Sequence, residues 1–162
     1  MKKLQFAMVG GGNGALIGDI HRIGAQFDDL AERKAGCFSR HWDKNLEAGE
    51  KWGVEPGRIY PDYHTMLEEE AKRTGEDRLD FVVVATPNNT HYEIVKDIIA
   101  HGFHIVCDKP VTFTSRESEE LKALAQEKDL LFGVSYSYAH YAILEQAKKM
   151  IADGVLGKIH TI

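Results

Sequence analysis

A glycine-rich loop follows the first apolar run of the chain, in the sequence AMVGGGNGALIG. Gly10, Gly12 and Ala15 stand in the spacing G-x-G-x-x-A. In a dinucleotide-binding turn, the first glycine permits the tight turn, the second lets backbone amides approach a pyrophosphate, and the third small residue packs helix on strand. A helix beginning near Gly14 would direct its free amides at the anion. We predict that this loop, with Asn13, binds a dinucleotide; a glycine-rich structural turn is the alternative.

Ser39 and Arg40 follow the apolar run AGCF, where the second strand is expected to end. An acidic residue here would accept hydrogen bonds from the ribose hydroxyls of NAD. A hydroxyl and a guanidinium suit the 2'-phosphate of NADP better. The predicted cofactor is therefore NAD(P), with NADP favoured. In the alternative interpretation, Arg40 is a solvated surface charge and Asp43 reaches the ribose.

A polar stretch, ATPNNTH, follows the apolar run FVVV. Ligands of open α/β sheets bind at the carboxyl ends of the strands, so this stretch is expected to line the crevice. Pro87 stiffens the turn, which lets Thr86 and Asn88 face the cofactor. His91 has two possible roles, a cofactor contact or a structural side chain.

The sequence CDKP follows the run HIV and places one lysine between an acid and a proline. An ammonium at Lys109, beside Asp108 and ahead of the rigid Pro110, can donate to a substrate oxygen and polarise it during hydride transfer. Lys109 is our candidate catalytic residue, and all three residues are candidates for cofactor contact. A surface lysine paired with its neighbour is the alternative.

Alternating strands and helices must position these loops. Continuous apolar runs, typical of strands covered on both faces, occur at residues 4–9, 35–38, 81–85, 104–107 and 130–134. Helical spacing of apolar residues occurs at 16–30, 94–99, 115–128 and 143–151. Thr90 and Thr114 are predicted helix caps. We predict an α/β, Rossmann-type, doubly wound parallel sheet with strand order 3-2-1-4-5-6.

The composition excludes several classes of partner. The chain has 162 residues, enough for one domain, and a formal net charge of -5 without a basic patch, so nucleic acid is not an expected partner. It contains no apolar stretch of membrane-spanning length, and we expect a cytoplasmic protein without a membrane partner. Cys37 and Cys107 are interpreted as buried reduced thiols. His101 and His104 lack a carboxylate or cysteine in ligand spacing, so no metal site is predicted.

Taken together, the glycine loop, the T-P-N-x-x-H segment ending at His91 and the D-K-P segment resemble the Gfo/Idh/MocA oxidoreductase family. The three motifs occur in the family's order, and the resemblance covers essentially the whole chain. The resemblance implies an NAD(P)-binding domain whose lysine, here Lys109, works near a substrate hydroxyl beside the nicotinamide. It also implies a following α/β domain that holds the substrate and contributes a second acid-base residue.

The resemblance is incomplete at one landmark. The family's N-Y-R-like segment is Ser137, Tyr138 and Ala139 here, so substrate contacts of that segment do not carry over. His21 and Arg22 match family members with a G-x-x-H-R segment, and for His21 we predict local packing or capping rather than chemistry, because the helix carries it away from the loop.

Two functions remain open at this stage. The first is the cofactor-binding domain, residues 1–157, of an oxidoreductase acting on a sugar-like small molecule, with residues 158–162 beginning a truncated substrate domain as a new strand. We expect the full-length protein to form a homo-oligomer. The alternative is a nucleotide-binding or sensing module without turnover, which would not need Lys109.

Overall fold

The computed structural model describes residues 2–161, which form a five-stranded parallel sheet. The strands are β1 (Leu4–Gly10), β2 (Ala31–Cys37), β3 (Phe81–Ala85), β4 (His104–Cys107) and β5 (Phe132–Val134). Their order is β2-β1-β3-β4-β5, so β1 lies inside the sheet. The order in which strands are added reverses at β1, because β2 lies on one side of it and β3 on the other. This arrangement confirms the predicted Rossmann-type α/β fold and creates a crevice at the carboxyl ends of β1 and β3.

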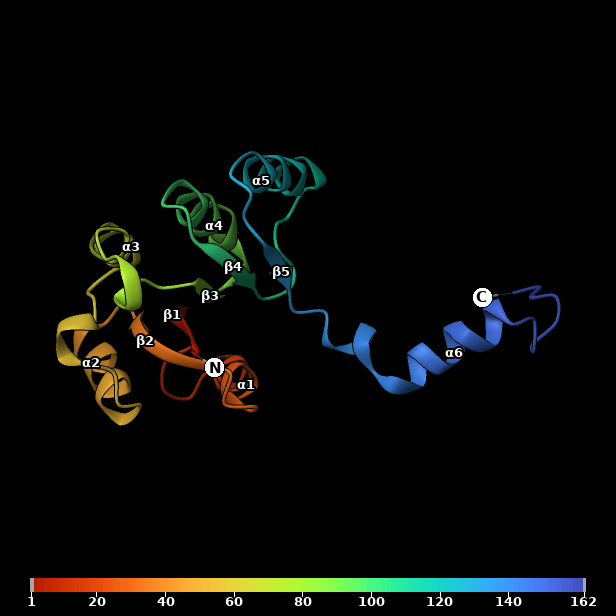
Figure 1. Ribbon diagram of the computed structural model, residues 1–162, viewed down its shortest axis with the longest axis horizontal. Coiled ribbons are helices and arrows are strands. Elements are labelled where there is room, and N and C mark those ends of the chain that lie inside the picture. The colour runs from red at the N-terminus through yellow and green to blue at the C-terminus, as the bar shows by residue number, and fades with distance from the viewer. Residues whose placement is uncertain (1, 162) are drawn as a thin grey trace.

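Helices cover both faces of the sheet (Figure 1). The covering helices are α1 (Leu16–Gln26), α2 (Trp42–Lys51), α3 (Tyr63–Ala71), α4 (His91–Ala100) and α5 (Ser115–Glu127), and a further helix, α6 (Ala142–Ala152), follows β5. Alternate residues of β1 serve the two sides: Ala7 and Val9 pack with α3, α4 and α5, whereas Phe6 and Met8 pack on the α1 and α2 side. Burial on both faces explains why the strands read as continuous apolar runs.

The predicted strand order needs one correction. The place of the third strand is taken by a single parallel bridge between Gly36 and Ile59, with Tyr60 N donating to Gly36 O at 3.0 Å. A short turn at Pro56–Arg58 precedes Ile59, so the extended backbone beside β2 begins only at Ile59. Residues in such a turn do not have the extended backbone of a strand, so the pairing does not continue before Ile59.

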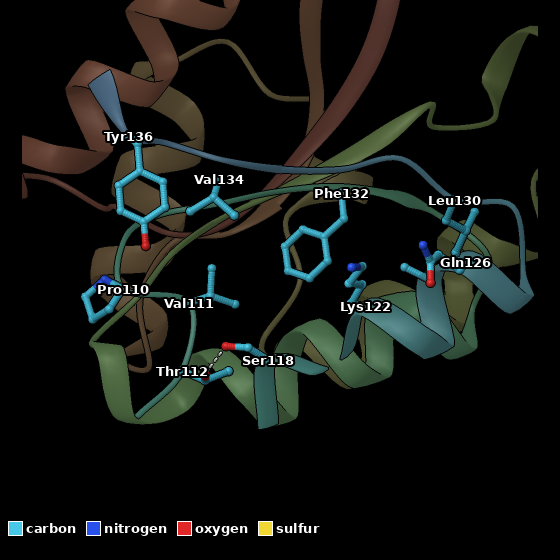
Figure 2. A pocket seen from close by; sticks show the side chains of 11 residues that line it. Pro110, Val111, Thr112, Ser118, Lys122, Gln126, Leu130, Phe132, Val134 and Tyr136 are labelled. Carbon is cyan, nitrogen blue, oxygen red and sulfur yellow. Dashed lines mark hydrogen bonds between the residues drawn. The ribbon is translucent and has the colours of Figure 1, made fainter. Parts of the chain in front are cut away.

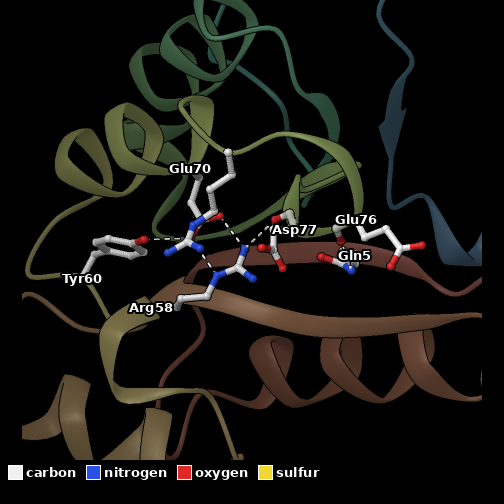
Figure 3. Close-up of polar contacts among 7 residues, drawn as sticks. Gln5, Arg58, Tyr60, Glu70, Glu76 and Asp77 are labelled. Carbon is white, nitrogen blue, oxygen red and sulfur yellow. Dashed lines mark hydrogen bonds and ion pairs between the residues drawn. The ribbon is translucent and has the colours of Figure 1, made fainter.

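A buried ion pair holds this shortened segment against α3 (Figure 3). The Arg58 guanidinium donates two hydrogen bonds to the Glu70 carboxylate, and Tyr60 Oη donates to Glu70 Oε1 at 2.7 Å. Glu70 is fully buried, and Arg58 is 4% exposed. Burial, with the bond to Glu70, raises the pKa of Tyr60 to about 12, so its hydroxyl remains a donor at neutral pH.

The predicted helix caps differ from each other. Thr114 forms a capping box, in which its side chain accepts from Glu117 N and the Glu117 carboxylate accepts from Thr114 N. Thr90 occupies the N-cap position of α4, but Thr90 Oγ1 donates to Pro87 O at 2.7 Å instead of capping a helix amide. Thr90 therefore holds the predicted N-cap position without a side-chain capping bond, because its backbone is helical (φ -109°, ψ -9°) rather than extended as in most N-cap residues.

Helix α1 presents its apolar stripe to solvent rather than to the sheet. The large side chains of this stripe are exposed, among them Leu16 at 73% and Phe27 at 81%. Gly18 lies on the opposite, inward face of α1 and is buried. A Cβ at this position would lie 2.3 Å from Gly11 Cα, so this close approach requires glycine. Small residues on the inward face let α1 approach the loop closely, whereas its large apolar side chains are exposed to solvent.

The last helix, α6, stands beyond β5 and away from the layers of the sheet (Figure 1). No side chain of α6 is buried within the part of the chain that the structure describes. Residues 158–161 do not form the strand expected there, and Ile162 lies outside the described residues. A strand requires a hydrogen-bonding neighbour, and residues 158–161 have none within 2–161.

Candidate functional site

A crevice of about 1020 Å³ opens at the carboxyl ends of β1, β2 and β3. Its wall includes the glycine loop (Gly10–Asn13 and Ala15), Ser39 and Arg40 after β2, and Thr86 and Pro87 after β3. The crevice is therefore continuous across three of the predicted segments. Asp43, the alternative ribose ligand, does not line it within the described chain.

The glycine loop requires glycine for steric reasons that the structure makes specific. Gly10 and Gly14 both have φ of 80°, a backbone conformation that favours glycine. A Cβ at Gly10 would lie 2.5 Å from Ala85 O, and one at Gly12 would lie 2.7 Å from Phe38 O. Gly12 N also donates to Phe38 O at 3.1 Å. The loop thus fits closely between the ends of β2 and β3 and forms a cradle without side chains.

The rest of the loop leads into α1. Ala15 N donates to Gly12 O at 3.0 Å, and Ala15 is the N-cap residue of α1. Asn13 accepts a hydrogen bond at Oδ1 from Lys51 Nζ of α2 at 3.2 Å. Sequence reasoning missed Gly18, whose contact with Gly11 sets how closely the helix approaches the loop. The sequence feature that could have indicated this contact is the glycine itself, which stands in the first turn of the helix after the glycine loop.

Residues after β2 add cationic groups to the crevice. Ser39 Oγ accepts from His41 N at 3.1 Å, which shapes the turn into α2. Arg40 is exposed on the wall, and it forms no ion pair with any residue of the described range. Lys44 and Glu47 of α2 also line the crevice, as do Asp62 and Glu93, so its charged lining is mixed.

The T-P-N segment contributes to the opposite wall. Thr86 and Pro87 line the crevice as expected, whereas the lining asparagine is Asn89 rather than Asn88. Asn88 is exposed and begins the short turn Asn88–Thr90. The Thr86 and Thr90 hydroxyl oxygens lie 2.8 Å apart, and this contact ties the segment together.

His91 lies beneath this wall. Its side chain is fully buried, and it does not line the crevice within the described residues. The ring spans two carbonyl oxygens, with Nδ1 2.8 Å from Pro110 O and Nε2 2.9 Å from Thr86 O. Of its two predicted roles, the geometry favours the structural one.

The D-K-P segment meets α1 through a polar cluster that sequence reasoning did not foresee. Ser135 Oγ donates to Asp108 Oδ1 at 2.7 Å, and His21 Nε2 lies 3.5 Å from the same oxygen. The helix therefore carries His21 toward the segment after β4, where it pairs with Asp108. Lys109 is exposed and forms no ion pair with the residues described, and the Lys109–Pro110 peptide is cis. Asp108 is thus engaged elsewhere, and the Lys109 ammonium is accessible.

Beyond Lys109 lies a second, smaller cavity of about 550 Å³ between α5 and β5 (Figure 2). Pro110 forms one end of it, with Val111, Phe132 and Tyr136 among the other lining residues. Pro110 therefore borders the smaller cavity, and neither Asp108 nor Lys109 lines either hollow in the described chain.

The two cysteines are buried free thiols, as interpreted from the sequence. Burial raises the pKa of both Cys37 and Cys107 to about 12. Thiols with such a pKa carry almost no thiolate at neutral pH, and the thiolate is the reactive form. The chemistry of the site therefore depends on other groups.

Comparison with known proteins decides the family. Residues 4–136 match the family model GFO_IDH_MocA, described as an oxidoreductase family with an NAD-binding Rossmann fold. The chain belongs to the Gfo/Idh/MocA oxidoreductase family. This result confirms the resemblance carried by the glycine loop, the T-P-N-x-x-H segment and the D-K-P segment.

Individual Gfo/Idh/MocA relatives match different lengths of the chain. The chain is 43% identical over 162 residues to Uncharacterized oxidoreductase YfiI of Bacillus subtilis, covering 99% of this chain and 41% of that protein. It is 36% identical over 107 residues to scyllo-inositol 2-dehydrogenase (NADP(+)) IolW of the same species, covering 66% and 30%.

A solved structure of an inositol dehydrogenase homolog from Azotobacter vinelandii, complexed with NADH and myo-inositol, gives a TM-score of 0.94. It is 43% identical, with 98% of this chain and 41% of that chain covered. The chain therefore spans about two fifths of the length of YfiI and of the Azotobacter vinelandii protein. It corresponds to the NAD-binding Rossmann domain of the Gfo/Idh/MocA family. Among residues 2–161, no helix is both long and apolar enough to cross a membrane.

Proposed function

We propose that this chain is the cofactor-binding part of an NAD(P)-dependent oxidoreductase that transfers hydride between the nicotinamide and a sugar, polyol or related hydroxy compound. The observation that carries the proposal is the side-chain-free cradle, where a Cβ at Gly10 or Gly12 would collide with backbone oxygens. This cradle opens into a crevice of about 1020 Å³, which fits a dinucleotide. The names of two relatives, which include inositol dehydrogenase activities, support the substrate class.

The residues divide the crevice into two ends. Amides of the loop at the start of α1, other than those of Gly12 and Ala15, which donate to Phe38 O and Gly12 O, would hold the pyrophosphate. Ser39 and Arg40 would hold the adenosine ribose, and Thr86 and Pro87 would bound the nicotinamide end. When bound, the nicotinamide supplies the hydride acceptor or donor.

Lys109 would act on the substrate. Its ammonium would donate a hydrogen bond to the reacting oxygen and stabilise the negative charge that develops there. The pairing of Asp108 with Ser135 and His21 supports this role, because it leaves the ammonium without an intramolecular partner among the described residues.

Cytoplasmic location, homo-oligomer formation and the absence of nucleic-acid and membrane partners stay predictions.

The proposed binding is tested by calorimetric titration of the chain with NADPH and NADH. We expect both to bind, and we expect Arg40→Ala to weaken NADPH about 10- to 150-fold more than NADH. The reason is that a charge-assisted hydrogen bond to the 2'-phosphate contributes about 1.5–3 kcal/mol and has no counterpart in NADH. Arg116→Ala, an exposed arginine of α5, is the control and should change neither affinity.

Equal losses for both cofactors would show that Arg40 does not contact the 2'-phosphate. Absence of binding by the unaltered chain would contradict the proposed function itself.

Lys109→Ala is expected to lower kcat of the full-length protein about 10²- to 10⁴-fold, the usual contribution of a positioned proton donor. Affinity for the cofactor should stay within about threefold, because Lys109 acts on the substrate oxygen. We expect the 162-residue chain to bind cofactor with little or no turnover, since hydride transfer needs a substrate held against the nicotinamide. Steady-state kinetics with inositols and related polyols measure kcat of the Lys109 variant and the turnover of the 162-residue chain.

Lys72→Ala, at the exposed end of α3, is the matched control. Undiminished activity of the Lys109 variant would favour the non-catalytic nucleotide-binding module, and full activity of the short chain would contradict its expected lack of turnover.

A further inference from the structure

His91 joins the two loops that flank the nicotinamide end of the proposed site. It is the first residue of α4, fully buried, and its ring contacts one carbonyl from each loop. Thr86 O belongs to the segment after β3, and Pro110 O follows Lys109 after β4. Within residues 2–161, neither ring nitrogen contacts a carboxylate or hydroxyl.

Donor counting limits the charge state of this ring. A carbonyl oxygen only accepts, and a neutral imidazole has one N–H, so a neutral ring can satisfy one of its two partners. The other nitrogen would then present a lone pair to a carbonyl oxygen less than 3 Å away. Turning the ring over does not help, because it would place ring carbons against both oxygens. An imidazolium, which has two N–H donors, satisfies both contacts.

Some features around the His91 ring disfavour a positive charge on it, and others favour one. Burial and the positive end of the α4 dipole disfavour a cation at this position. The charged groups nearby in sequence do not compensate it: Asp108 contacts Ser135 and His21, and Glu93 is exposed. Two short charge-assisted hydrogen bonds favour the cation, because losing either would leave a buried lone pair facing another.

We propose that His91 is a doubly protonated positioning residue that clamps the T-P-N segment to the Lys109–Pro110 segment. The clamp fixes the nicotinamide end of the crevice and the backbone that carries Lys109. This inference rests on the proposed function for the identity of the ligand, but the clamp itself is a property of the chain alone.

The clamp predicts an asymmetric loss of binding. Among the described residues, His91 forms hydrogen bonds with neither the glycine loop nor Ser39 and Arg40, which would hold the pyrophosphate and adenosine. ADP-ribose contains those parts of NADH and lacks the nicotinamide ring. A His91→Gln side chain can donate from one end only, so it releases one of the two loops. We expect NADH affinity to fall about tenfold or more, and ADP-ribose affinity to change less than about twofold.

Calorimetry on the 162-residue chain gives both affinities, with His64→Gln as the control because that side chain is exposed and outside the crevice. Parallel losses for NADH and ADP-ribose would show a general structural effect and overturn the positioning role, as would unchanged NADH affinity. If the unaltered chain binds neither ligand, the proposed function fails on its own.

The charge state is measured without any ligand. Nitrogen NMR of the unaltered chain near neutral pH should show both His91 ring nitrogens carrying protons. One protonated nitrogen would overturn the clamp, because a neutral ring cannot hold both loops. This measurement also decides the matter if the glutamine variant does not fold.

Discussion

Glu70→Leu is expected to lower the free energy of unfolding by about 3–5 kcal/mol, which for a chain of this size lowers Tm by roughly 6–20 °C. The substitution leaves the Arg58 guanidinium buried without its carboxylate and removes the acceptor of the Tyr60 hydroxyl. Removing one partner of a buried pair costs more than the pair contributes, because the remaining charge stays desolvated. Thermal and urea unfolding measure the change.

Two further variants make the cause specific. Glu68→Leu changes an exposed acid on the same helix and should shift Tm by little. The double variant Arg58→Met/Glu70→Leu removes both charges and should recover much of the loss. A double variant as unstable as the single one would show that packing, rather than the uncompensated charge, accounts for the effect.

Gly12→Val is expected to weaken NADH and NADPH binding by about 100-fold or more. Its side chain would occupy the cradle and prevent the approach of a pyrophosphate to the backbone amides, and losing two hydrogen bonds to a charged group costs about 3 kcal/mol or more. The Cβ would also lie 2.7 Å from Phe38 O, so we expect a separate loss of stability of about 1–3 kcal/mol. Calorimetry and thermal unfolding separate the two effects.

Gly24→Ala is the control, since a Cβ at Gly24 meets no described atom within 4 Å and alanine suits a helix. A folded Gly12→Val protein that binds NADH as tightly as the unaltered chain would contradict the cradle.

Local patterns predicted the parts of the molecule that depend on local geometry. The spacing of Gly10, Gly12 and Ala15 after an apolar run was enough to place a strand, a tight turn and a helix. The capping box at Thr114 and the burial of both cysteines also follow from short-range chemistry. The parallel sheet followed from the alternation of apolar runs with helical spacing.

Long-range contacts could not be predicted in this way. The pairing of His21 with Asp108 joins residues 87 positions apart, and it depends on how closely α1 approaches β4. That approach is permitted by Gly18 against Gly11, a contact visible only once the helix is packed. The carbonyl partners of His91 are likewise backbone atoms, which leave no mark in the sequence.

The outward-facing stripe of α1 bears on how unfolding is best followed. Four large apolar side chains of this stripe are each more than half exposed: Leu16, Ile20, Ile23 and Phe27. The folded chain therefore already presents apolar surface to which hydrophobic dyes bind. Fluorescence from such a dye would be high before heating begins and would underestimate the transition of a Glu70 variant. Far-ultraviolet circular dichroism detects the helical backbone itself and is insensitive to this surface, which makes it the appropriate signal for this domain.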